Sequence, residues 1–346
     1  MKVRHTLHQH THAHLSKLCL YNGLVKEPLL KLWQLCCLRL GGAGSNHEFL
    51  HAFESEPAQP LISVGRLHTK HTHLESHQSC PIGSSQRHRE LSHLKEKEQN
   101  QSDGFIGLID LHCVQGRYPP DFMDAWDTFN QKKCSENDRP DFFKKDQIFL
   151  ILEFEFGGAD LENSNGKLAS LGVAKSILHQ VTAALAVAEQ ELHFEHRDLH
   201  WGNVLVKPTK QKKGSFLLNG TVHSVETRGV LVRIIDYSLS RLEIDDLTVS
   251  CDISNDEELF MGQGDYQFDI YRLMRKENGN NWTNYHPHTN VLWLHYLCSK
   301  LLSMKYRSAR GKAVKAFKEA LTQFSNDVLQ YGSATEVLRT CSMFKE

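Results

Sequence analysis

The sequence predicts an α+β fold in which strands come first and helices follow. Residues 105–116 and 146–158 are short apolar stretches that end at glycine, which is typical of strands. From residue 291 onwards, apolar residues instead recur at the spacing of amphipathic helices. A chain of 346 residues, 40% of them hydrophobic, is also long and apolar enough to bury a core.

The first hundred residues differ in composition from the rest. Thirteen of the 22 histidines lie before residue 100, among clusters of Gly, Ser and Gln. Residues 29–40 predict one short buried helix. Four alternating histidines could bind a transition metal loosely on an extended strand: His8, His10, His12 and His14. A solvated polar tail is the alternative that the sequence favours, because no Cys or carboxylate stands beside them at ligand spacing.

The later part of the chain predicts a regular succession of elements. The stretches 105–116 and 146–158 are expected to be two strands of one sheet. They are followed by a buried helix over 174–192, a strand over 230–236 that ends in a carboxylate, and helices over 291–306 and 312–331. A last helix is expected to begin at Ser333, because Glu336 completes the spacing of a capping box.

Composition excludes several classes of protein. The 40 basic and 41 acidic residues give a net charge of -1, which excludes binding to DNA or a membrane through bulk charge. The nine cysteines are scattered and odd in number, unlike a secreted disulfide framework. The chain also lacks an uninterrupted apolar window of 18 residues and an apolar amino-terminal signal. We therefore expect a soluble protein of a reducing compartment, without direct DNA binding and without membrane attachment.

The segment HRDLHWGN, residues 196–203, has the spacing of a phosphoryl-transfer catalytic loop. Such a loop needs a carboxylate that accepts the proton of the attacking hydroxyl, and Asp198 fits that role. Five residues on, an amide oxygen must hold Mg²⁺ against the phosphates, and Asn203 fits it. The segment follows the predicted helix 174–192 directly, so we expect it on a loop held by the scaffold.

A second carboxylate is needed because one amide oxygen cannot hold a cation against a triphosphate. Asp236 ends the predicted strand 230–236 and lies 33 residues after Asn203, where Asp-Tyr-Ser replaces the common Asp-Phe-Gly. Taken alone, an Asp that ends a strand is more often a helix cap. Together with the loop, it predicts Asn203 and Asp236 as the metal ligands, and Asp198, Asn203 and Asp236 as the catalytic set.

The segment LEFEFGGADLE, residues 152–162, occupies the place of a nucleotide-binding hinge between a strand and the long helix. Glu155 and Gly157 would contact the adenine edge through their main chains, Phe154 would form the back wall, and Asp160 would bind the ribose hydroxyls. An ordinary strand-to-helix turn with a Gly-Gly break is the alternative. The predicted ATP-binding residues are Phe154, Glu155, Phe156, Gly157, Gly158, Asp160, Asp236, Tyr237 and Ser238.

A strongly acidic segment follows Asp236. Residues 236–269 contain ten acidic residues and one basic residue, Arg241. A solvated acidic face is the usual explanation of such a run. Its place directly after a metal-binding carboxylate favours a docking site for a basic peptide instead, with Asp252, Asp256 and Glu258 as the best candidates.

These stretches together resemble the haspin family of atypical protein kinases. The likeness runs from about residue 104 to the carboxyl end and includes FEHRDLHWGNVL, IIDYSLSRLE, CDISNDEELF, GDYQFDIYRLM, YHPHTNVLWLHYL and SATEVLRTCSMFK. The family has Asp-Tyr-Thr where this chain has Asp-Tyr-Ser, so Ser238 is a mild departure. The block CDISNDEELF is more specific than the catalytic loop.

The resemblance implies a protein-kinase-like bilobal fold with a largely helical C-lobe. It implies Mg²⁺, ATP and phosphorylation of a threonine in the basic amino-terminal tail of histone H3, by a monomer, on mitotic chromosomes in the nucleus. It further places His200 and Trp201 at the substrate with the acidic residues, and gives His196 and Arg197 structural roles. Asp269 would brace the catalytic loop from a helix.

The chain departs from that family before residue 104. No glycine-rich loop, strand lysine or paired helix glutamate is recognisable there, and Ser84 stands where the glutamate is expected. We therefore predict a truncated or rewritten N-lobe: a histidine-rich, mostly irregular region over 1–103 and a kinase domain over 104–346. Three functions follow as alternatives: an active histone kinase, a catalytically impaired module that binds basic peptides, and a small-molecule phosphotransferase, against which CDISNDEELF argues.

Overall fold

The computed structural model describes residues 61–67, 81–135, 138–308 and 312–345. The chain divides into two compact units, one built from residues 1–72 and 109–154 and one from 73–108 and 155–346. We call them the small unit and the large unit. The predicted helix over 29–40 and the four alternating histidines lie outside the described residues.

The small unit contains a three-stranded sheet. Its strands are β1 (Leu61–Leu67), β2 (Leu108–Gln115) and β3 (Ile148–Phe154), in the order β1-β3-β2. β1 and β3 are antiparallel, with Leu61 opposite Phe154 and Leu67 opposite Ile148. The prediction that the two later strands share one sheet is confirmed. β1 lies within the stretch predicted to be mostly irregular. Its sequence, LISVGRL, gives only a weak strand signal because a glycine interrupts the apolar residues.

One helix of the small unit was missed by the sequence pattern. α4 (Pro120–Lys133) begins with a proline, which suits the first helical position because no N–H is needed there. It packs through Trp126 against Tyr118 and Phe149, which form a buried aromatic cluster. After the helix, Arg139 holds Asp127 through two parallel bonds of 2.8 and 2.9 Å. These contacts fix the connection between β2 and β3.

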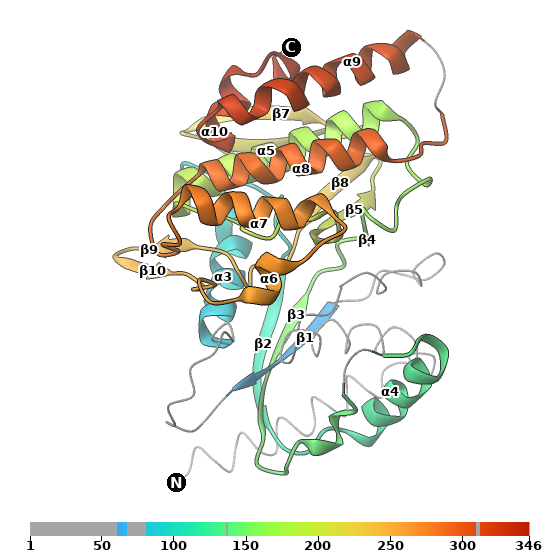
Figure 1. The fold of residues 1–346 in the computed structure, drawn as a ribbon, viewed down its shortest axis with the longest axis vertical. Helices are drawn as coiled ribbons and strands as arrows, with labels where there is room; N and C mark the ends of the chain where they lie inside the picture. The colour runs from blue at the N-terminus through green and yellow to red at the C-terminus, as the bar shows by residue number, and fades with distance from the viewer. Residues whose placement is uncertain (1–60, 68–80, 136–137, 309–311, 346) are drawn as a thin grey trace. The chain divides into compact units, whose positions relative to one another are not determined.

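The large unit is organised around α5 (Leu171–Leu192). The sequence predicted this helix over 174–192, three residues shorter at its start. It is long and apolar enough to span a membrane, but 83% of its apolar window is buried inside the protein, as in a core helix. It packs against three helices that Figure 1 shows beside it: α8 (His288–Ser303), α9 (Lys312–Asp327) and α10 (Ala334–Thr340).

A short antiparallel sheet joins the three segments that contain most of the predicted site residues. Its order is β4-β5-β8, formed by β4 (Ala159–Asp160), β5 (Val204–Pro208) and β8 (Val230–Ile234). The pair of glycines before β4 is required by packing. A Cβ on Gly157 would lie 2.6 Å from Leu205, and Gly158 adopts a φ of +105° with its missing Cβ 2.2 Å from the Val206 carbonyl. The Gly-Gly break therefore lets the chain run close along β5.

The remaining elements of the large unit surround this core. Two hairpins are formed by β6 (Lys213–Leu218) with β7 (Thr221–Glu226), and by β9 (Leu242–Ile244) with β10 (Leu247–Val249). The other helices are α3 (Pro81–His93), α6 (Glu257–Met261) and α7 (Tyr266–Glu277). Short 3₁₀ turns cover Leu94–Glu96, Trp201–Asn203, Val328–Gln330 and Ser342–Phe344. A further 3₁₀ turn, Pro140–Phe142, belongs to the small unit. At the start of α10, the Ser333 hydroxyl accepts from the Glu336 N–H as in a capping box, whereas the Glu336 carboxylate accepts from the Gly332 N–H and not from that of Ser333.

A buried carboxylate joins α5 to the C-terminal helix. Glu189 is 1% exposed, and it accepts from the N–H groups of Ala334 and Thr335, from the Thr335 hydroxyl and from Asn290. Burial raises the pKa of Glu189, while the four donors oppose this rise. Glu189 thus satisfies the N–H groups that the first turn of α10 leaves unpaired.

Replacing Glu189 by alanine is expected to lower the free energy of unfolding by about 2–4 kcal/mol, because two main-chain donors and Asn290 would lose their buried acceptor. Urea unfolding at neutral pH measures this loss. Glu319→Gln, on the exposed side of α9, is the control and should change stability by less than about 0.5 kcal/mol. Equal stability of the two variants would contradict the capping role.

Candidate active site

The catalytic loop lies between α5 and β5 and is held from both ends. His193 ends α5 in the left-handed conformation, with a φ of 45°. His196 is fully buried, and its Nδ1 accepts from the Asp198 N–H over 3.2 Å. Its Nε2 therefore carries the hydrogen, which it donates to the Ile235 carbonyl over 3.0 Å. His196 links the loop to the segment that precedes Asp236.

Strand register places Asn203 beside Asp236. Val204 pairs with Ile234 in the β5 and β8 ladder, and the Ile235 N–H donates to the Asn203 carbonyl over 3.0 Å. Asp236 is the next residue, and its φ of 67° turns the chain out of the strand. Two residues that are 33 positions apart in the sequence thus become neighbours because their strands pair.

The side chains at this point suit a divalent cation. The Asn203 amide nitrogen donates to the Asp198 carbonyl over 2.8 Å, which leaves the amide oxygen as the ligand atom. One Asp236 oxygen accepts from the Ser238 hydroxyl over 2.6 Å. An amide and a carboxylate suit Mg²⁺, which takes few protein ligands and completes its shell with phosphate and water. Among the described residues, no group of three or more His, Cys, Asp or Glu side chains forms a metal site.

Asp198 is on the same loop and is 3% exposed. Its backbone carbonyl is fixed by Asn203, and its carboxylate oxygen Oδ1 accepts from the Tyr271 hydroxyl over 2.5 Å. The structure therefore brings the three predicted catalytic residues into one loop-and-strand unit. Sequence analysis missed Tyr271, because nothing in the pattern of α7 shows which of its faces meets a loop 73 residues earlier.

Arg197 is buried in an ion pair that sequence analysis also missed. Its guanidinium donates to both Glu195 oxygens, over 3.1 and 3.0 Å, and to the Trp282 carbonyl over 2.7 Å. Both charged side chains are 0% exposed. Glu195 also accepts from the His286 N–H and the Thr289 hydroxyl, so each of its two oxygens has two donors.

The segment predicted to bind adenine begins at the unit boundary. Phe154 is the last residue of β3 in the small unit, and Glu155 begins the large unit. The Glu155 N–H donates to the Gly107 carbonyl, and its carboxylate accepts from the Gly107 N–H and from Arg233. The Phe156 carbonyl accepts from Lys207. The main-chain roles of Glu155 and Gly157, and the back-wall role of Phe154, stay predictions.

Asp160, which was predicted to bind the ribose hydroxyls, uses both of its carboxylate oxygens in hydrogen bonds to Asn163. It is 2% exposed, and its two oxygens accept from the Asn163 N–H and side-chain amide, each over 2.8 Å. Burial raises the pKa of Asp160, while the Asn163 bonds oppose this rise. In the described structure, its carboxylate closes the turn after β4.

The Asp-Tyr-Ser segment packs against α3. Tyr237 is fully buried, and its hydroxyl donates to the Ile234 carbonyl over 2.6 Å, while burial raises its pKa. The Ser238 carbonyl accepts from Arg87 of α3 over 3.4 Å. The His88 ring lies 4.6 Å from the Tyr237 ring, and burial together with nearby Arg87 lowers the pKa of His88 to about 3.

The lowered pKa of His88 predicts loss of stability in mild acid. Unfolded His88 binds a proton below its ordinary pKa of 6.5, whereas the folded residue stays neutral down to about 3, so acid favours the unfolded state. Between pH 7 and 5, His88 should contribute about 1–2 kcal/mol of the loss in unfolding free energy. His88→Phe, which keeps a ring against Tyr237, should lose correspondingly less over this range in urea unfolding.

The wild type and the variant both retain His179, whose pKa is also lowered by burial, to about 4. Their difference therefore isolates His88. Identical pH dependence of the two proteins would show that His88 does not remain neutral in the fold.

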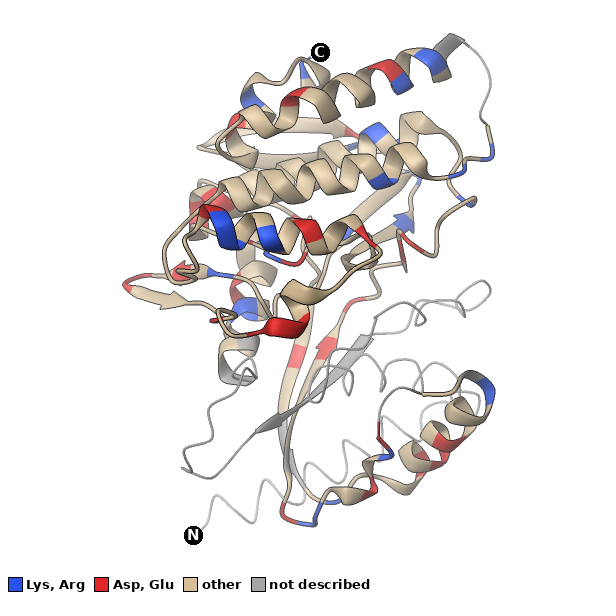
Figure 2. Cartoon of the chain, viewed as in Figure 1, with Lys and Arg blue, Asp and Glu red and all other residues tan. Residues whose placement is uncertain are grey.

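The acidic segment contains residues of two kinds. Glu243, Asp265 and Asp269 form ion pairs with Arg241, Lys300 and Arg272 respectively. The three predicted docking residues lie in and just before α6, whose first turn Figure 2 shows in red. Asp252 is exposed and accepts from the Ser254 N–H, Asp256 caps α6 through the Leu259 N–H, and Glu258 is exposed.

The two substrate residues that the resemblance implies lie on the catalytic loop. His200 is 7% exposed and accepts from the Gly202 N–H over 3.1 Å, which starts the 3₁₀ turn. Trp201 is half-buried, and the Lys300 ammonium lies 4.8 Å above its ring. Their roles at the substrate stay predictions.

Asp269 does not occupy the position that the resemblance implies. Its side chain is 57% exposed, and it accepts from Arg272 on the surface of α7. The residue of this helix that contacts the catalytic loop is Tyr271. Two positions along a helix correspond to a rotation of about 200°, so these two side chains leave opposite faces.

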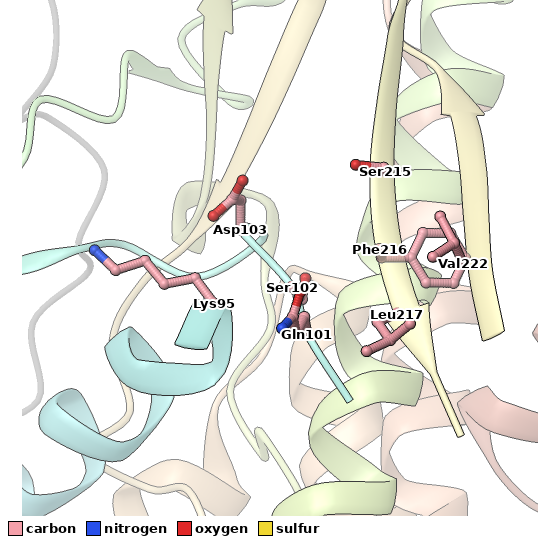
Figure 3. Close-up of a pocket in the computed structure, with 8 residues that line it drawn as sticks. All are labelled: Lys95, Gln101, Ser102, Asp103, Ser215, Phe216, Leu217 and Val222. Atoms are coloured by element: carbon pink, nitrogen blue, oxygen red, sulfur yellow. The ribbon is translucent and has the colours of Figure 1, made fainter. Parts of the chain in front are cut away.

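A surface pocket of the large unit lies apart from these residues. Figure 3 shows it between the segment that follows α3 and the β6-β7 hairpin. Its lining residues are Lys95, Gln101, Ser102, Asp103, Ser215, Phe216, Leu217 and Val222. None of them belongs to the predicted site.

Comparison with known proteins gives a family match. Residues 81–338 match the family described as Haspin like kinase domain. The serine/threonine-protein kinase haspin of Bos taurus is 58% identical over 259 residues, and that of Mus musculus is 57% identical over 259 residues. The Drosophila melanogaster haspin homolog is 39% identical over 248 residues, which cover 71% of this chain and 44% of the homolog.

The chain spans about a third of the length of its mammalian relatives. The alignments cover 74% of this chain but 33% of the bovine and 34% of the mouse protein. Among solved structures, that of the Cydia pomonella granulovirus kinase PK-1 aligns with 84% of this chain and 87% of its own chain, at 10% identity and a TM-score of 0.42. The family match begins at residue 81 and extends over more than half of the chain. This chain belongs to the family of haspin-like protein kinases.

Proposed function

We propose that the chain is a serine/threonine protein kinase that transfers the γ-phosphate of ATP to a threonine in the basic amino-terminal tail of histone H3. The observation that supports it most directly is the pairing of β5 with β8. This pairing sets Asn203, which is on the same loop as Asp198, beside Asp236. The site of action that goes with this function is the mitotic chromosome in the nucleus.

Each residue has a defined task in this reaction. ATP with Mg²⁺ supplies the phosphoryl group and neutralises charge that develops on it. The Asn203 and Asp236 oxygens would hold the cation, and Asp198 would accept the proton of the threonine hydroxyl. The fold fixes these three groups before substrate arrives, because His196 and Asn203 hold the loop from its backbone.

The charge around α6 supports the proposed substrate class. Asp252 and Glu258 are exposed, and they follow the metal-binding segment in the chain. Lysine and arginine side chains of a histone tail complement such a surface, which would raise the association rate and fix the register of the peptide.

The test is transfer from labelled ATP, with Mg²⁺, to a peptide of the histone H3 amino-terminal tail. A double variant, Asp252→Asn with Glu258→Gln, should raise the KM for this peptide about fivefold to tenfold and leave the KM for ATP unchanged. Glu319→Gln removes a charge on α9 and is the control. No transfer by the wild type would overturn the proposed activity, and unchanged peptide KM would overturn the proposed docking surface.

A second candidate is a module that binds basic peptides without transferring phosphate. Its support is the amino-terminal part of the chain, where α3 carries Ser84 at the position expected for the paired glutamate. In kinases that glutamate positions the lysine that contacts the phosphates. Affinity for the histone peptide together with no measurable ATP binding would favour this second function.

A further inference from the structure

Tyr271 makes the contact that most directly involves the proposed catalytic base. Its hydroxyl donates to Oδ1 of Asp198 over 2.5 Å, and each of the two side chains is 3% exposed. A bond between a hydroxyl and a carboxylate in such a buried place is charge-assisted and stronger than a neutral one. It connects α7 to a residue that lies 73 positions earlier in the chain.

The tyrosine itself is held rigidly. Its ring meets the ring of Trp293 on α8 edge to face, with centroids 5.4 Å apart, and Trp293 is fully buried. The helix that carries it is capped by Asp265, which accepts from the Gln267 N–H and is paired with Lys300 of α8. The position of the hydroxyl is therefore set by packing between two helices.

We infer that Tyr271 is a positioning residue for phosphoryl transfer, an inference that rests on the proposed kinase activity. Asn203 fixes the backbone of Asp198, and Tyr271 fixes the rotation of its carboxylate. A carboxylate has about four lone-pair sites, so a bond at Oδ1 leaves it able to accept a proton from substrate. Holding its plane keeps a lone pair directed at the hydroxyl, on which the efficiency of a general base depends.

Tyr271→Phe tests this role, because it removes the hydroxyl and keeps the ring against Trp293. We expect kcat for the histone peptide to fall about tenfold, equivalent to about 1.4 kcal/mol of transition-state stabilisation, because the carboxylate is no longer held in its reactive orientation. The KM values for ATP and peptide should stay unchanged, and the melting temperature should fall by no more than about 4 °C, because the ring still packs on Trp293. Tyr266→Phe is the matched control: it removes a hydroxyl from the same helix, one that bonds to His295.

A double-mutant cycle shows whether Tyr271 acts through Asp198. In an Asp198→Asn background, Tyr271→Phe should cause no further tenfold loss, because the carboxylate whose orientation it controls is gone. A full additional loss in that background would overturn the inference, as would unchanged kcat or equal losses in Tyr271→Phe and Tyr266→Phe.

A rise in kcat would also overturn it, because the bond would then restrain the base from reacting. A wild type that transfers no phosphate is a separate result, recognised before any variant is compared. It overturns the proposed activity and, with it, the role of Tyr271.

Discussion

Asp198→Asn is expected to slow phosphate transfer to the histone peptide about 10³-fold in kcat, while ATP binding stays within about twofold of the wild type. Asparagine keeps the shape of the side chain but cannot accept a proton from the attacking hydroxyl. The backbone carbonyl of residue 198 still accepts from Asn203, so the metal ligands should keep their positions. Initial rates with labelled ATP measure kcat, and calorimetric titration with ATP and Mg²⁺ measures binding.

The control is Asp246→Asn, which replaces an exposed carboxylate in the turn between β9 and β10. It lies in the acidic segment and should leave kcat unchanged. Transfer by Asp198→Asn at more than about a tenth of the wild-type rate would contradict the assignment of Asp198 as the base.

Arg197→Met is expected to lower the free energy of unfolding by about 3–5 kcal/mol. The substitution leaves the buried Glu195 carboxylate without its guanidinium partner, and the Trp282 carbonyl loses a donor. Both residues 195 and 197 are 0% exposed, so water cannot replace the lost bonds. Methionine, like arginine, has a Cβ, so the backbone cost of the φ of 67° is the same in both proteins. Urea unfolding at neutral pH measures the change.

A surface ion pair provides the comparison for that measurement. Lys315 and Glu319 on α9 are 3.8 Å apart, with side chains 82% and 66% exposed. Lys315→Met should cost less than about 0.5 kcal/mol, because water solvates the glutamate that remains. If Arg197→Met lowers the free energy of unfolding by less than about 1 kcal/mol, the ion pair between Arg197 and Glu195 is solvated in solution.

The sequence predicted the elements whose signals are local. A long apolar helix before the loop, a strand before Asp236 and the serine cap at Ser333 each depend on a few neighbouring residues, and the structure contains all three. The strand β8 ends at Ile234, two residues before Asp236. The sequence did not predict β1 or α4. β1 is a strand because it pairs with β3, and α4 packs on an aromatic cluster drawn from separate segments.

In the site, too, local features were predicted from the sequence and tertiary contacts were not. The spacing of Asp198 and Asn203 is a property of one loop, and the place of Asp236 at a strand end follows from an alternating apolar pattern. The resemblance assigned the contact between α7 and the loop to Asp269, whereas the structure gives it to Tyr271. Which face of a helix meets a distant loop depends on how that helix packs on its neighbours, here on Trp293 of α8.

By itself, the sequence predicted the kind of chemistry, because hydroxyl activation and metal binding need particular side chains at fixed short spacings. Only the tertiary structure decided which buried partners hold the loop and the helices around it: Glu195 under the loop, Glu189 at the C-terminal helix and Tyr271 at Asp198. The physical reason is that a buried charge or hydroxyl must find its partner within about 3 Å, and in a folded chain that partner is often far away in the sequence.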